Sequence, residues 1–410
     1  MKYGLIGERL GHSFSKEIHE QIGKYEYELK ELNEEEFKEF MEKKDFVAIN
    51  VTIPYKEKVI PYLYAISKSA KYIGAVNTII NRDGKLYGYN TDYLGLKEMI
   101  NHFNIDVENK NVMILGTGGT AKTSYQVLTD LDAKDVTFVS LVHKDDWITY
   151  DEVSEHAPNY QILVNTTPKE MFPNNYQSII SLEHFSNLES VIDVVFNPLR
   201  TNLIVQAKNE KIKCCSGLFM LVAQAFYAIE IFLDKKLDKS LILEVYNKLV
   251  NEKENIVLIG MPSCGKTTVG KELAKLTKKE FIDTDALIEE KIEMSIAEFF
   301  KIYGEKEFRR VETEIIKQIG KKQNLIISTG GGVVLKKENV DALKQNGKLF
   351  FLDRDLDKLQ FTASRPLSSD KQKLTDLFNK RYLYYLNACD ILVDANGDVQ
   401  DVVNKILGGK

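Results

Sequence analysis

The sequence predicts an α/β protein with parallel sheets that is divided into more than one compact unit. Short apolar runs typical of buried strands alternate with helix-length amphipathic segments; examples are residues 112–115, 136–139, 162–164 and 256–260. The chain has 410 residues, which exceeds the roughly 100 to 200 residues of an average domain. Two or three units, each with its own core, are therefore expected.

The composition is that of an ordinary globular protein, with 44% hydrophobic and 28% charged residues. The formal net charge is -5 and the two signs are mixed along the chain, which argues against nucleic acid or an anionic membrane as a partner. The four cysteines show neither zinc-ligand nor disulfide-rich spacing, so we expect free thiols and a cytoplasmic location. The oligomeric state is not readable from the sequence.

Two segments were tested as membrane or export signals. The N-terminal MKYGLIG is too short for the apolar core of a signal peptide. The most apolar stretch, residues 217–233, falls short of the roughly 20 residues that a membrane span needs and contains Gln224 and Glu230. This stretch therefore predicts a buried helix.

The first hundred residues contain four dense polar clusters, each at the end of an apolar run: GHSFS, NVTIPYK, GAVNT and GYNTDYLG, which begin at residues 11, 50, 74 and 88. In this order they resemble the substrate domain of the shikimate dehydrogenases, with its S-x-S, N-V-T-x-P-x-K, G-A-V-N-T and N-T-D-x-x-G motifs. The resemblance implies that this part of the chain is a substrate-binding α/β lobe.

The family's roles carry over residue by residue. The resemblance implies that Ser13 and Ser15 bind the substrate carboxylate, and that the ring hydroxyls are surrounded by Thr52, Lys56, Asn77, Asp92 and, in the family's M-L-x-x-Q-A pattern, Gln224. Reduction of a ring ketone leaves an oxyanion that needs a proton, and a lysine paired with an aspartate can donate it. Lys56 is therefore the expected general acid/base and Asp92 its partner. Without the surrounding motif, Lys56 would be interpreted as a solvated surface lysine.

A glycine-rich turn after the strand at 112–115 predicts a Rossmann-like nucleotide lobe. Gly116 suits a tight turn, Gly118 lets the backbone approach a pyrophosphate, and Ala121 is small where helix meets strand. The helix N-terminus would add unpaired N–H groups and a positive dipole end. The expected cofactor-binding residues are Gly116, Thr117, Gly118, Gly119, Thr120 and Ala121. Alone, the pattern also fits a glycine-rich turn without a ligand.

Several positions depart from the family pattern. Where the family has Asn-Arg-Ser/Thr, whose arginine holds the 2′-phosphate of NADP, this chain has residues 140–142, Ser-Leu-Val, followed by His143 and Lys144. No acidic residue stands there for NAD. NADP(H) is the cofactor that the resemblance implies, and NAD stays open.

Three bulkier or altered side chains stand elsewhere: Phe196 for a tyrosine, and Glu170 and Phe219 for glycines. Side chains at the two glycine positions could fill space near the nicotinamide. The rival hypothesis is therefore a dehydrogenase-like half that has lost its cofactor and serves as a shikimate-binding or scaffolding module.

The second nucleotide motif, GMPSCGKT at residues 260–267, fits G-x-x-x-x-G-K-[ST] completely and lies between a strand and a helix pattern. The loop predicts ATP phosphates held by backbone N–H groups and Lys266, with Thr267 as a ligand of Mg²⁺. The expected ATP-binding residues are Ser263, Cys264, Gly265, Lys266, Thr267, Thr268 and, later in the chain, Arg365. The loop alone does not separate a kinase from another nucleotide hydrolase.

The segment from about residue 254 to 410 resembles the shikimate kinases. Its motifs are D-T-D at 283–285, F-R-x-x-E around Arg309, a Gly-Gly-Gly run centred on Gly331, R-P-L around Arg365 and a late Arg381. The resemblance implies that Asp285 binds ring hydroxyls, Arg309 and Arg381 bracket the carboxylate, and Arg365 lies on a lid. Asp283 would lie near the Mg²⁺ ion and the attacking hydroxyl, so Asp283 and Thr267 are the expected metal residues.

Both signatures then point to one metabolite. The resemblance implies reduction of 3-dehydroshikimate to shikimate, then ATP-dependent phosphorylation of the 3-hydroxyl; quinate stays open as a further substrate. A generic nucleotide kinase fused to an unrelated oxidoreductase would lack the Arg309, Gly331 and Arg381 pattern. The expected lobes are a substrate lobe at 1–105 with 216–250, a Rossmann-like lobe at 106–215, and a P-loop kinase domain with a parallel sheet at 254–410.

Overall fold

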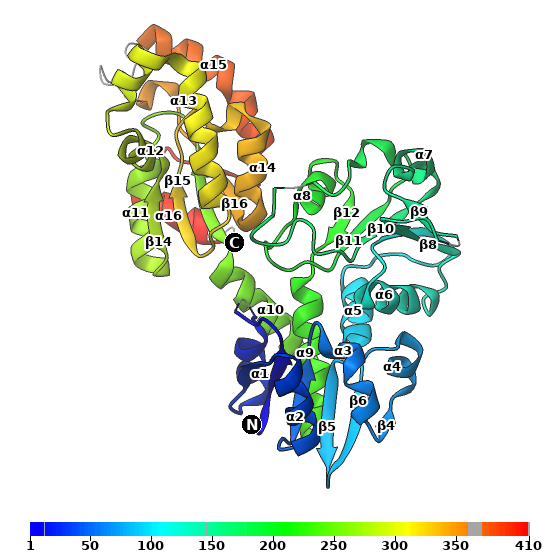
Figure 1. Cartoon of the computed structure of the whole chain (residues 1–410). Coiled ribbons are helices and arrows are strands. Elements are labelled where there is room, and N and C mark those ends of the chain that lie inside the picture. Colours follow the sequence, from blue (N-terminus) through cyan, green and yellow to red (C-terminus); the bar gives the residue numbers. More distant parts are fainter. Residues whose placement is uncertain (12, 145, 177, 360–370, 409–410) are drawn as a thin grey trace. The chain divides into compact units, whose positions relative to one another are not determined.

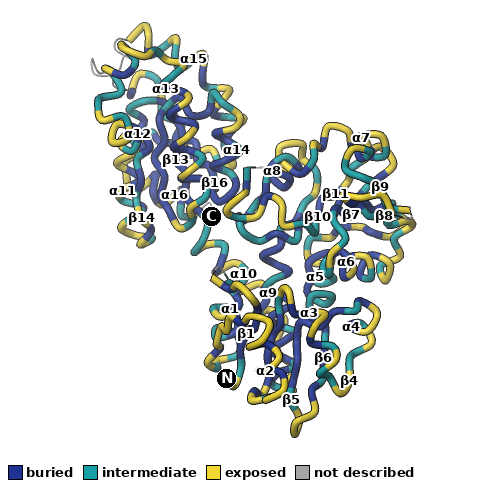
Figure 2. The backbone as a smooth tube through the Cα atoms, viewed as in Figure 1, coloured by how far each residue is buried: buried dark blue, intermediate teal, exposed yellow. Residues whose placement is uncertain are grey.

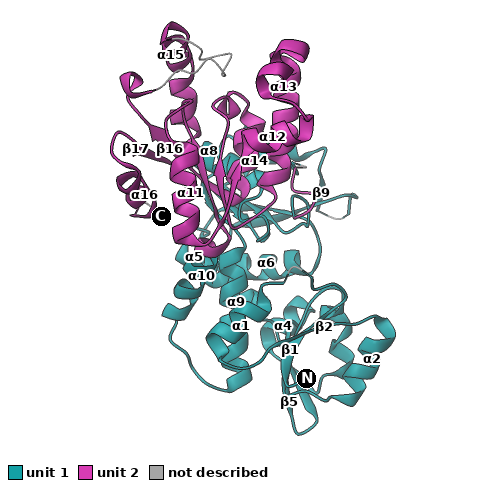
Figure 3. Cartoon of the chain, turned by 90° about the vertical axis from the view of Figure 1, so that its left-hand side faces the viewer, with its two compact units in different colours: residues 1–171, 177–249 teal, residues 172–176, 250–410 magenta. Residues whose placement is uncertain are grey.

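The computed structural model describes residues 1–11, 13–144, 146–176, 178–359 and 371–408, which contain three sheets (Figure 1). The chain divides into two compact units, one formed by residues 1–171 with 177–249 and the other by residues 172–176 with 250–410 (Figure 3). The first unit contains two of the sheets and the second unit contains the third. The α/β architecture predicted from the alternating pattern is confirmed.

The first sheet is mixed and has the order β2-β1-β3-β5-β6-β4. β1 is parallel to β2 and β3, β5 is antiparallel to β3 and β6, and β4 is parallel to β6. The strands are β1 (Tyr3–Gly7), β2 (Glu28–Glu31), β3 (Ala48–Val51), β4 (Ala65–Ile66), β5 (Thr78–Arg82) and β6 (Lys85–Tyr89). The helices of this lobe are α1 (Ser15–Gly23), α2 (Glu34–Lys43), α3 (Tyr55–Lys58), α4 (Lys68–Ile73) and α5 (Thr91–His102).

The apolar stretch that was predicted as a buried helix forms α9 (Leu218–Leu233), most of whose residues are buried. α9 packs closely on α5, and Gly95 explains how: a Cβ at this position would lie 2.8 Å from both Gln224 Cβ and Met220 O. In the part of the chain that the structure describes, no helix has the length and apolarity that crossing a lipid bilayer requires.

The second sheet is entirely parallel, with the order β12-β11-β10-β7-β8-β9. Its strands are β7 (Asn111–Leu115), β8 (Asp135–Ser140), β9 (Ile148–Thr149), β10 (Ile162–Asn165), β11 (Ser190–Asp193) and β12 (Lys213–Cys215), and its helices are α6 (Gly119–Thr129), α7 (Val153–His156) and α8 (Asn202–Asn209). The strand order reverses between β7 and β10. In such sheets ligands bind outside the carboxyl ends of the strands at this switch point, where the glycine-rich turn lies.

The third sheet is also parallel, with the order β14-β15-β13-β16-β17, and its three central strands are largely buried (Figure 2). The strands are β13 (Asn255–Ile259), β14 (Glu280–Asp283), β15 (Leu325–Ser328), β16 (Gly347–Asp353) and β17 (Ile391–Asp394). The helices are α11 (Lys266–Thr277), α12 (Thr284–Ile292), α13 (Ile296–Gly320), α14 (Lys337–Asn346), α15 (Lys371–Ala388) and α16 (Val399–Gly408). α13 is kinked at Gly304, whose φ is 77°.

The charged segment at residues 251–255 contains the end of a helix. α10 (Ser240–Lys253) runs across the division between the units, and its last carbonyls are satisfied. Lys279 Nζ donates to Glu252 O at 2.9 Å and to Glu254 O at 3.0 Å. A buried lysine at this position complements the negative end of the helix dipole.

Candidate active sites

Lys56 and Asp92, which come from two of the polar clusters of the N-terminal lobe, form an ion pair. Lys56 Nζ lies 2.6 Å from Asp92 Oδ2, and the side chains are 23% and 14% exposed. Lys56 lies on α3, directly after the strand β3, and Asp92 lies in the first turn of α5. Two motifs separated by 36 residues thus meet as a partly shielded ion pair that can still reach a small ligand.

The two predicted serines lie where the chain enters α1. Ser13 Oγ accepts a hydrogen bond of 3.2 Å from Ser15 N, and Ser15 begins the helix. The ring of Phe14, between them, lies 5.5 Å from the ring of Phe196. Phe196, which replaces the tyrosine expected near the substrate, therefore lies next to this serine loop.

Asn77 and Gln224 are brought together through Thr91. Thr91 N donates to Asn77 Oδ1 at 2.7 Å, and Thr91 Oγ1 donates to Gln224 Oε1 at 3.4 Å. Thr52, directly after β3, is held by its backbone, since its N–H donates to Ile6 O at 3.0 Å. These residues come from β3, the start of β5, α5 and α9, so the fold gathers the predicted set from four elements.

The glycine-rich turn joins β7 to α6 at the switch point. Gly116 has a φ of 99°, and its N–H donates to Val139 O at 2.9 Å. A Cβ at Gly118 or Gly119 would meet no described protein atom within 4 Å, so these two glycines are not required by packing. That open backbone at a helix N-terminus suits a close-lying phosphate.

The end of β8 lies beside this turn. Leu141 and Val142 are 81% and 65% exposed. His143 Nε2 lies 3.2 Å from Glu152 Oε1, and Lys144 Nζ lies 5.1 Å from the centre of the Trp147 ring. The two basic side chains that follow β8 are thus engaged with protein groups.

Glu170 does not project outward from its turn. Its φ is 65°, and its fully buried carboxylate accepts hydrogen bonds from Ile179 N at 2.8 Å and Leu203 N at 2.9 Å. Burial raises the pKa of Glu170 to about 7, although the backbone donors oppose this, and the nearby Asp193 adds to the rise. The expectation that this side chain fills space beside the nicotinamide is wrong, because it turns into the interior of the nucleotide lobe.

Phe219 is also directed into the protein. Its ring is 2% exposed, stacks on His102 with 4.3 Å between centres, and makes an edge contact of 5.3 Å with Tyr246. The expected obstruction by Phe219 is wrong for the same reason: the larger side chain fills a core position among α5, α9 and α10. Two of the departures that motivated the rival hypothesis are thereby removed, and the missing arginine at residues 140–142 remains.

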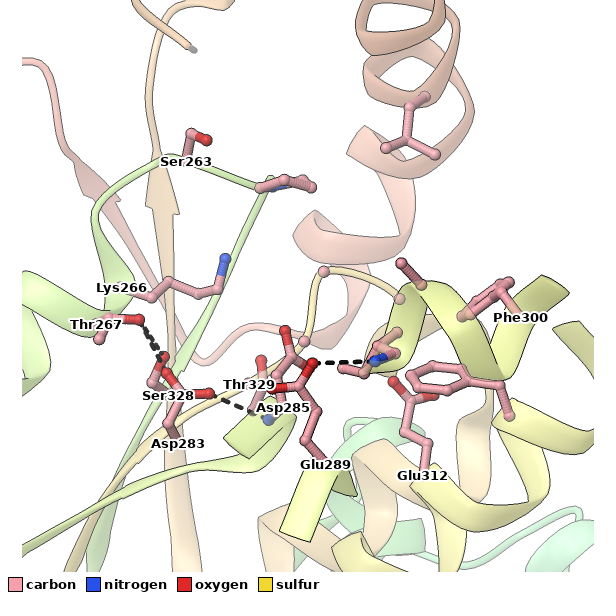
Figure 4. Close-up of a pocket in the computed structure, with 18 of the residues that line it drawn as sticks. Ser263, Lys266, Thr267, Asp283, Asp285, Glu289, Phe300, Glu312, Ser328 and Thr329 are labelled. Atoms are coloured by element: carbon pink, nitrogen blue, oxygen red, sulfur yellow. Dashed lines mark hydrogen bonds between the residues drawn. The ribbon is translucent and has the colours of Figure 1, made fainter. Parts of the chain in front are cut away.

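The second site lies in a cavity of about 690 Å³ in the C-terminal unit. The loop between β13 and α11 wraps around Lys266, which is 7% exposed and donates to Gly260 O and Met261 O, both at 2.9 Å. Cys264 Sγ lies 3.7 Å from the same ammonium. The cavity is lined by residues of this loop and by Asp283, Asp285, Arg309, Gly331 and Arg381, so these five predicted residues share one pocket with the loop (Figure 4).

Thr267 and Asp283 are direct neighbours in this pocket. Thr267 Oγ1 donates to Asp283 Oδ2 at 2.9 Å and lies 3.4 Å from Ser328 Oγ (Figure 4). The other Asp283 oxygen accepts from Asp285 N at 3.1 Å and caps α12. Hydroxyl and carboxylate oxygens close to a phosphate-binding loop are the donors that Mg²⁺ prefers, so this pair fits that ion.

Arg309 is held by two carboxylates of its own helix. Its Nη1 donates to both oxygens of Glu312, at 3.0 and 2.8 Å, and its Nη2 donates to Glu305 at 3.1 Å. Glu312 is 1% exposed, and burial raises its pKa while Arg309 opposes that rise. Gly332 lies against this guanidinium: a Cβ there would lie 2.3 Å from it, so a larger residue would displace the Arg309 side chain.

Arg381 approaches the same place from α15. Its Nη1 donates to Gly331 O at 3.0 Å, and the hydroxyl of Tyr385 also donates to Gly331 O. Burial lowers the pKa of Arg381 from its usual value. Asp285 lies beside the same glycine run, since a Cβ at Gly330 would be 2.5 Å from Asp285 Oδ1. Arg365 lies outside the described residues.

Glu312, Glu305 and Tyr385 were missed as functional candidates from the sequence. The spacing of Glu312 could have predicted its pairing with Arg309, because an Arg and a Glu three residues apart are neighbours on a helix surface. Tyr385 carried none, since its contact with Gly331 joins residues 54 apart in the chain.

Comparison with known proteins identifies both halves. Residues 5–79 match the family described as "Shikimate dehydrogenase substrate binding domain", and residues 262–408 match the family described as "Shikimate kinase". The "Shikimate dehydrogenase (NADP(+))" of Clostridium beijerinckii is 40% identical over 267 residues, covering 61% of this chain and 98% of the relative. The protein of the same name from Clostridium perfringens (strain 13 / Type A) is 39% identical over 265 residues, covering 60% of this chain and 97% of the relative.

A solved structure agrees with the dehydrogenase matches. The chorismate mutase/shikimate 5-dehydrogenase fusion protein from Clostridium acetobutylicum is 36% identical, has a TM-score of 0.57, and covers 60% of this chain and 96% of its own.

Proposed function

The chain belongs to the shikimate dehydrogenase family in its N-terminal part and continues into a shikimate kinase domain, and from this premise we propose how its two sites work. The protein is a bifunctional enzyme of the shikimate pathway. It reduces 3-dehydroshikimate to shikimate with NADPH and then transfers a phosphoryl group from ATP to the 3-hydroxyl of shikimate. The observation that carries this proposal is that one chain contains both the Lys56–Asp92 pair at 2.6 Å and the Thr267–Asp283 pair at 2.9 Å.

Lys56 is the proton donor of the reduction. Bound NADPH supplies a hydride to the ring ketone carbon. The carbonyl oxygen then keeps the electron pair of the broken π bond, and the ammonium of Lys56 protonates it to the hydroxyl. Asp92 accepts from Nζ at 2.6 Å and holds the lysine in the orientation needed.

The substrate shell surrounds that pair. Ser13 and Ser15 lie at the N-terminal end of α1, where hydroxyls and the helix dipole favour a carboxylate. The ring hydroxyls are assigned to Thr52, Asn77 and Gln224. These polar side chains come from separate elements and fix the ring against Lys56.

The turn from Gly116 to Ala121 holds the pyrophosphate of the nicotinamide nucleotide. The support is the positive φ of Gly116 and the open backbone at Gly118 and Gly119. NADP is the cofactor, as in the relatives. Residues 140–142 lack the arginine that binds the 2′-phosphate in the family, so the experiment compares NAD⁺ with NADP⁺.

The kinase site divides into a nucleotide side and a substrate side. Lys266 and the backbone of residues 263–268 hold the ATP phosphates, and Thr267 with Asp283 would hold Mg²⁺, which neutralises phosphate charge when bound. Asp285 orients the ring hydroxyls, and Arg309 and Arg381 bind the carboxylate. Arg365 is assigned to the nucleotide side from its motif alone.

The boundaries of the lobes follow from this assignment. We assign the dehydrogenase substrate lobe to residues 1–105 with 216–250, the nucleotide lobe to 106–215 and the kinase to 254–410. The cytoplasm is the proposed location, because the four cysteines are free thiols.

The test measures both reactions on one preparation. The purified chain is given shikimate with NADP⁺ or, separately, NAD⁺, and reduction of the nicotinamide is followed by absorbance; ATP-dependent phosphorylation of shikimate is measured in parallel. We expect both reactions, with NADP⁺ preferred. Phosphorylation without reduction of either nucleotide would instead favour the rival, a shikimate-binding module fused to a kinase.

A further inference from the structure

A buried chain of hydrogen bonds runs beneath the dehydrogenase substrate site. It begins at Tyr27, which is fully buried just before β2 and whose hydroxyl donates to Asn50 Oδ1 at 2.8 Å. Asn50 Nδ2 donates to Asn77 O at 3.1 Å and to Thr78 Oγ1 at 3.0 Å. Thr78 Oγ1 lies 3.0 Å from Asn77 Oδ1 and 3.1 Å from Thr91 Oγ1.

The directions of the bonds made by Tyr27 and Asn50 are fixed by a backbone group that can play only one role. Asn77 O is a backbone carbonyl and can only accept, so Asn50 must turn Nδ2 toward it and Oδ1 toward Tyr27. Tyr27 must then donate its proton. The other hydrogen of Asn50 Nδ2 points at Thr78 Oγ1, which leaves the Thr78 proton free to be donated onward.

The same logic sets the amide of Asn77. Thr91 N can only donate, and it lies 2.7 Å from Asn77 Oδ1, so the oxygen of this amide is committed to the protein. The Nδ2 group is the half of the amide left to donate to a substrate hydroxyl. Thr91 Oγ1 lies 3.2 Å from Asn77 Oδ1 and 3.4 Å from Gln224 Oε1 and can donate its one proton to either, so the chain ends at two proposed substrate ligands.

We propose that Tyr27 is a positioning residue for shikimate, which acts through Asn50 and Thr78 to fix the donor face of Asn77. This inference rests on the proposed dehydrogenase function and deepens it. Tyr27 is itself held rigidly, because the ring of His19 stacks on it with 4.0 Å between centres. Without the tyrosine hydroxyl, Asn50 Oδ1 would be a buried acceptor without its donor, and the Asn50 amide that bonds to Asn77 O and Thr78 Oγ1 would be held less firmly, while Asn77 O would keep its bond of 2.9 Å from Val51 N.

The test variant is Tyr27→Phe, and the matched control is Tyr25→Phe. Tyr25 lies in the same aromatic cluster and its hydroxyl also makes one side-chain hydrogen bond, 2.8 Å to His19 Nδ1, but it lies outside the chain that leads to Asn50. Steady-state oxidation of shikimate is measured for both, with phosphorylation of shikimate by the kinase half as a control for intact protein.

For Tyr27→Phe we expect the KM for shikimate to rise about tenfold, with kcat, the KM for NADP⁺ and the pH profile nearly unchanged. Tyr25→Phe should leave the KM for shikimate unchanged. A Tyr27→Phe/Thr78→Val double variant should be no worse than the poorer single variant, because both act through one path. An unchanged KM in Tyr27→Phe, an equal rise in Tyr25→Phe, or additive effects would each overturn the inference.

If Tyr27→Phe fails to fold, Thr78 gives a second test. Thr78→Val, which removes the hydroxyl at nearly constant shape, should raise the KM for shikimate, and Thr78→Ser, which keeps the hydroxyl, should restore it. Equal KM values for these two variants would overturn the inference. Wild-type protein that oxidises no shikimate would refute the dehydrogenase function itself, which is a separate result.

Discussion

The carboxylate of Glu170 accepts a hydrogen bond of 2.9 Å from the backbone N–H of Leu203, in the first turn of α8. A negative charge is favoured at this end of a helix. Burial outweighs that preference, because the pKa of Glu170 is raised to about 7, and burial also raises the pKa of Asp193 to about 6. The nucleotide lobe therefore contains two buried carboxyl groups that hold their protons more tightly in the folded chain than in the unfolded chain.

This relationship predicts a pH-dependent stability of the first unit. Between the ordinary pKa of 4.5 and about 7, the unfolded chain releases the Glu170 proton while the folded chain retains it. The contribution of Glu170 to the free energy of unfolding, on the order of 3 kcal/mol, should therefore be fully present below pH 4.5, fall as pH rises to about 7, and then level off. Glu170→Gln should flatten this slope.

Denaturant unfolding followed by tryptophan fluorescence measures the effect. The chain has one tryptophan, Trp147, whose ring lies 5.6 Å from Phe138 of β8, so the signal reports the nucleotide lobe. Glu183→Gln, at a side chain that is 72% exposed, is the control and should leave the slope as in the wild type. A slope that survives in Glu170→Gln would assign the pH dependence to other groups.

Removal of the Lys56 ammonium should abolish the reduction and spare the kinase. Lys56→Met takes away the proton donor, and loss of such a group lowers kcat by roughly 10²- to 10⁴-fold. Lys58→Met is the matched control, because Lys58 lies two residues away on α3 and pairs with the exposed Glu34 at 3.0 Å. Shikimate oxidation and phosphorylation are measured on each variant. Equal losses in both lysine variants would contradict the assignment.

The sequence predicted what depends on local spacing, and the fold confirmed it at particular places. The strand before Gly116 and the loop before Lys266 lie where their motifs required them, and the stretch 217–233 is the buried helix α9. These features are set by residues that are neighbours in the chain or on one helix face.

The direction of single side chains depends on tertiary packing, which the sequence does not display. Glu170 and Phe219 were seen only as bulk at glycine positions, and their partners Leu203 and Tyr246 are more than twenty residues away along the chain. The short segment 172–176, which belongs to the second compact unit, likewise had no local signal.

Leu141 offers a direct test of nucleotide preference. It follows β8 beside the glycine-rich turn, is 81% exposed, and occupies the position at which an arginine was expected. A guanidinium there can pair with a 2′-phosphate, so Leu141→Arg should lower the KM for NADP⁺ by about tenfold and leave that for NAD⁺ unchanged. Val142→Arg is the control for added charge alone. A similar gain from both variants would show a nonspecific effect.

We expect Glu312 to hold Arg309, the proposed substrate-binding arginine of the kinase, in position. Arg309 is 9% exposed and bonds to both oxygens of Glu312, so Glu312→Gln leaves a buried guanidinium with much less charge compensation. Breaking a buried pair in this way costs about 3–5 kcal/mol when nothing replaces the partner. Because Glu305 still contacts Nη2, we expect the lower end of that range, as a lower melting temperature of the kinase unit.

The same substitution should raise the KM for shikimate in phosphorylation by at least about tenfold, because the unpaired guanidinium changes position and no longer meets the carboxylate. Glu314→Gln, on the same helix but 45% exposed and paired with Lys291, is the control and should change neither value. Shikimate oxidation by the first half checks that the protein is intact. A lower melting temperature with an unchanged KM would mean that Glu312 stabilises α13 without positioning Arg309, and the arginine would then owe its orientation to Glu305 and the backbone at Gly332.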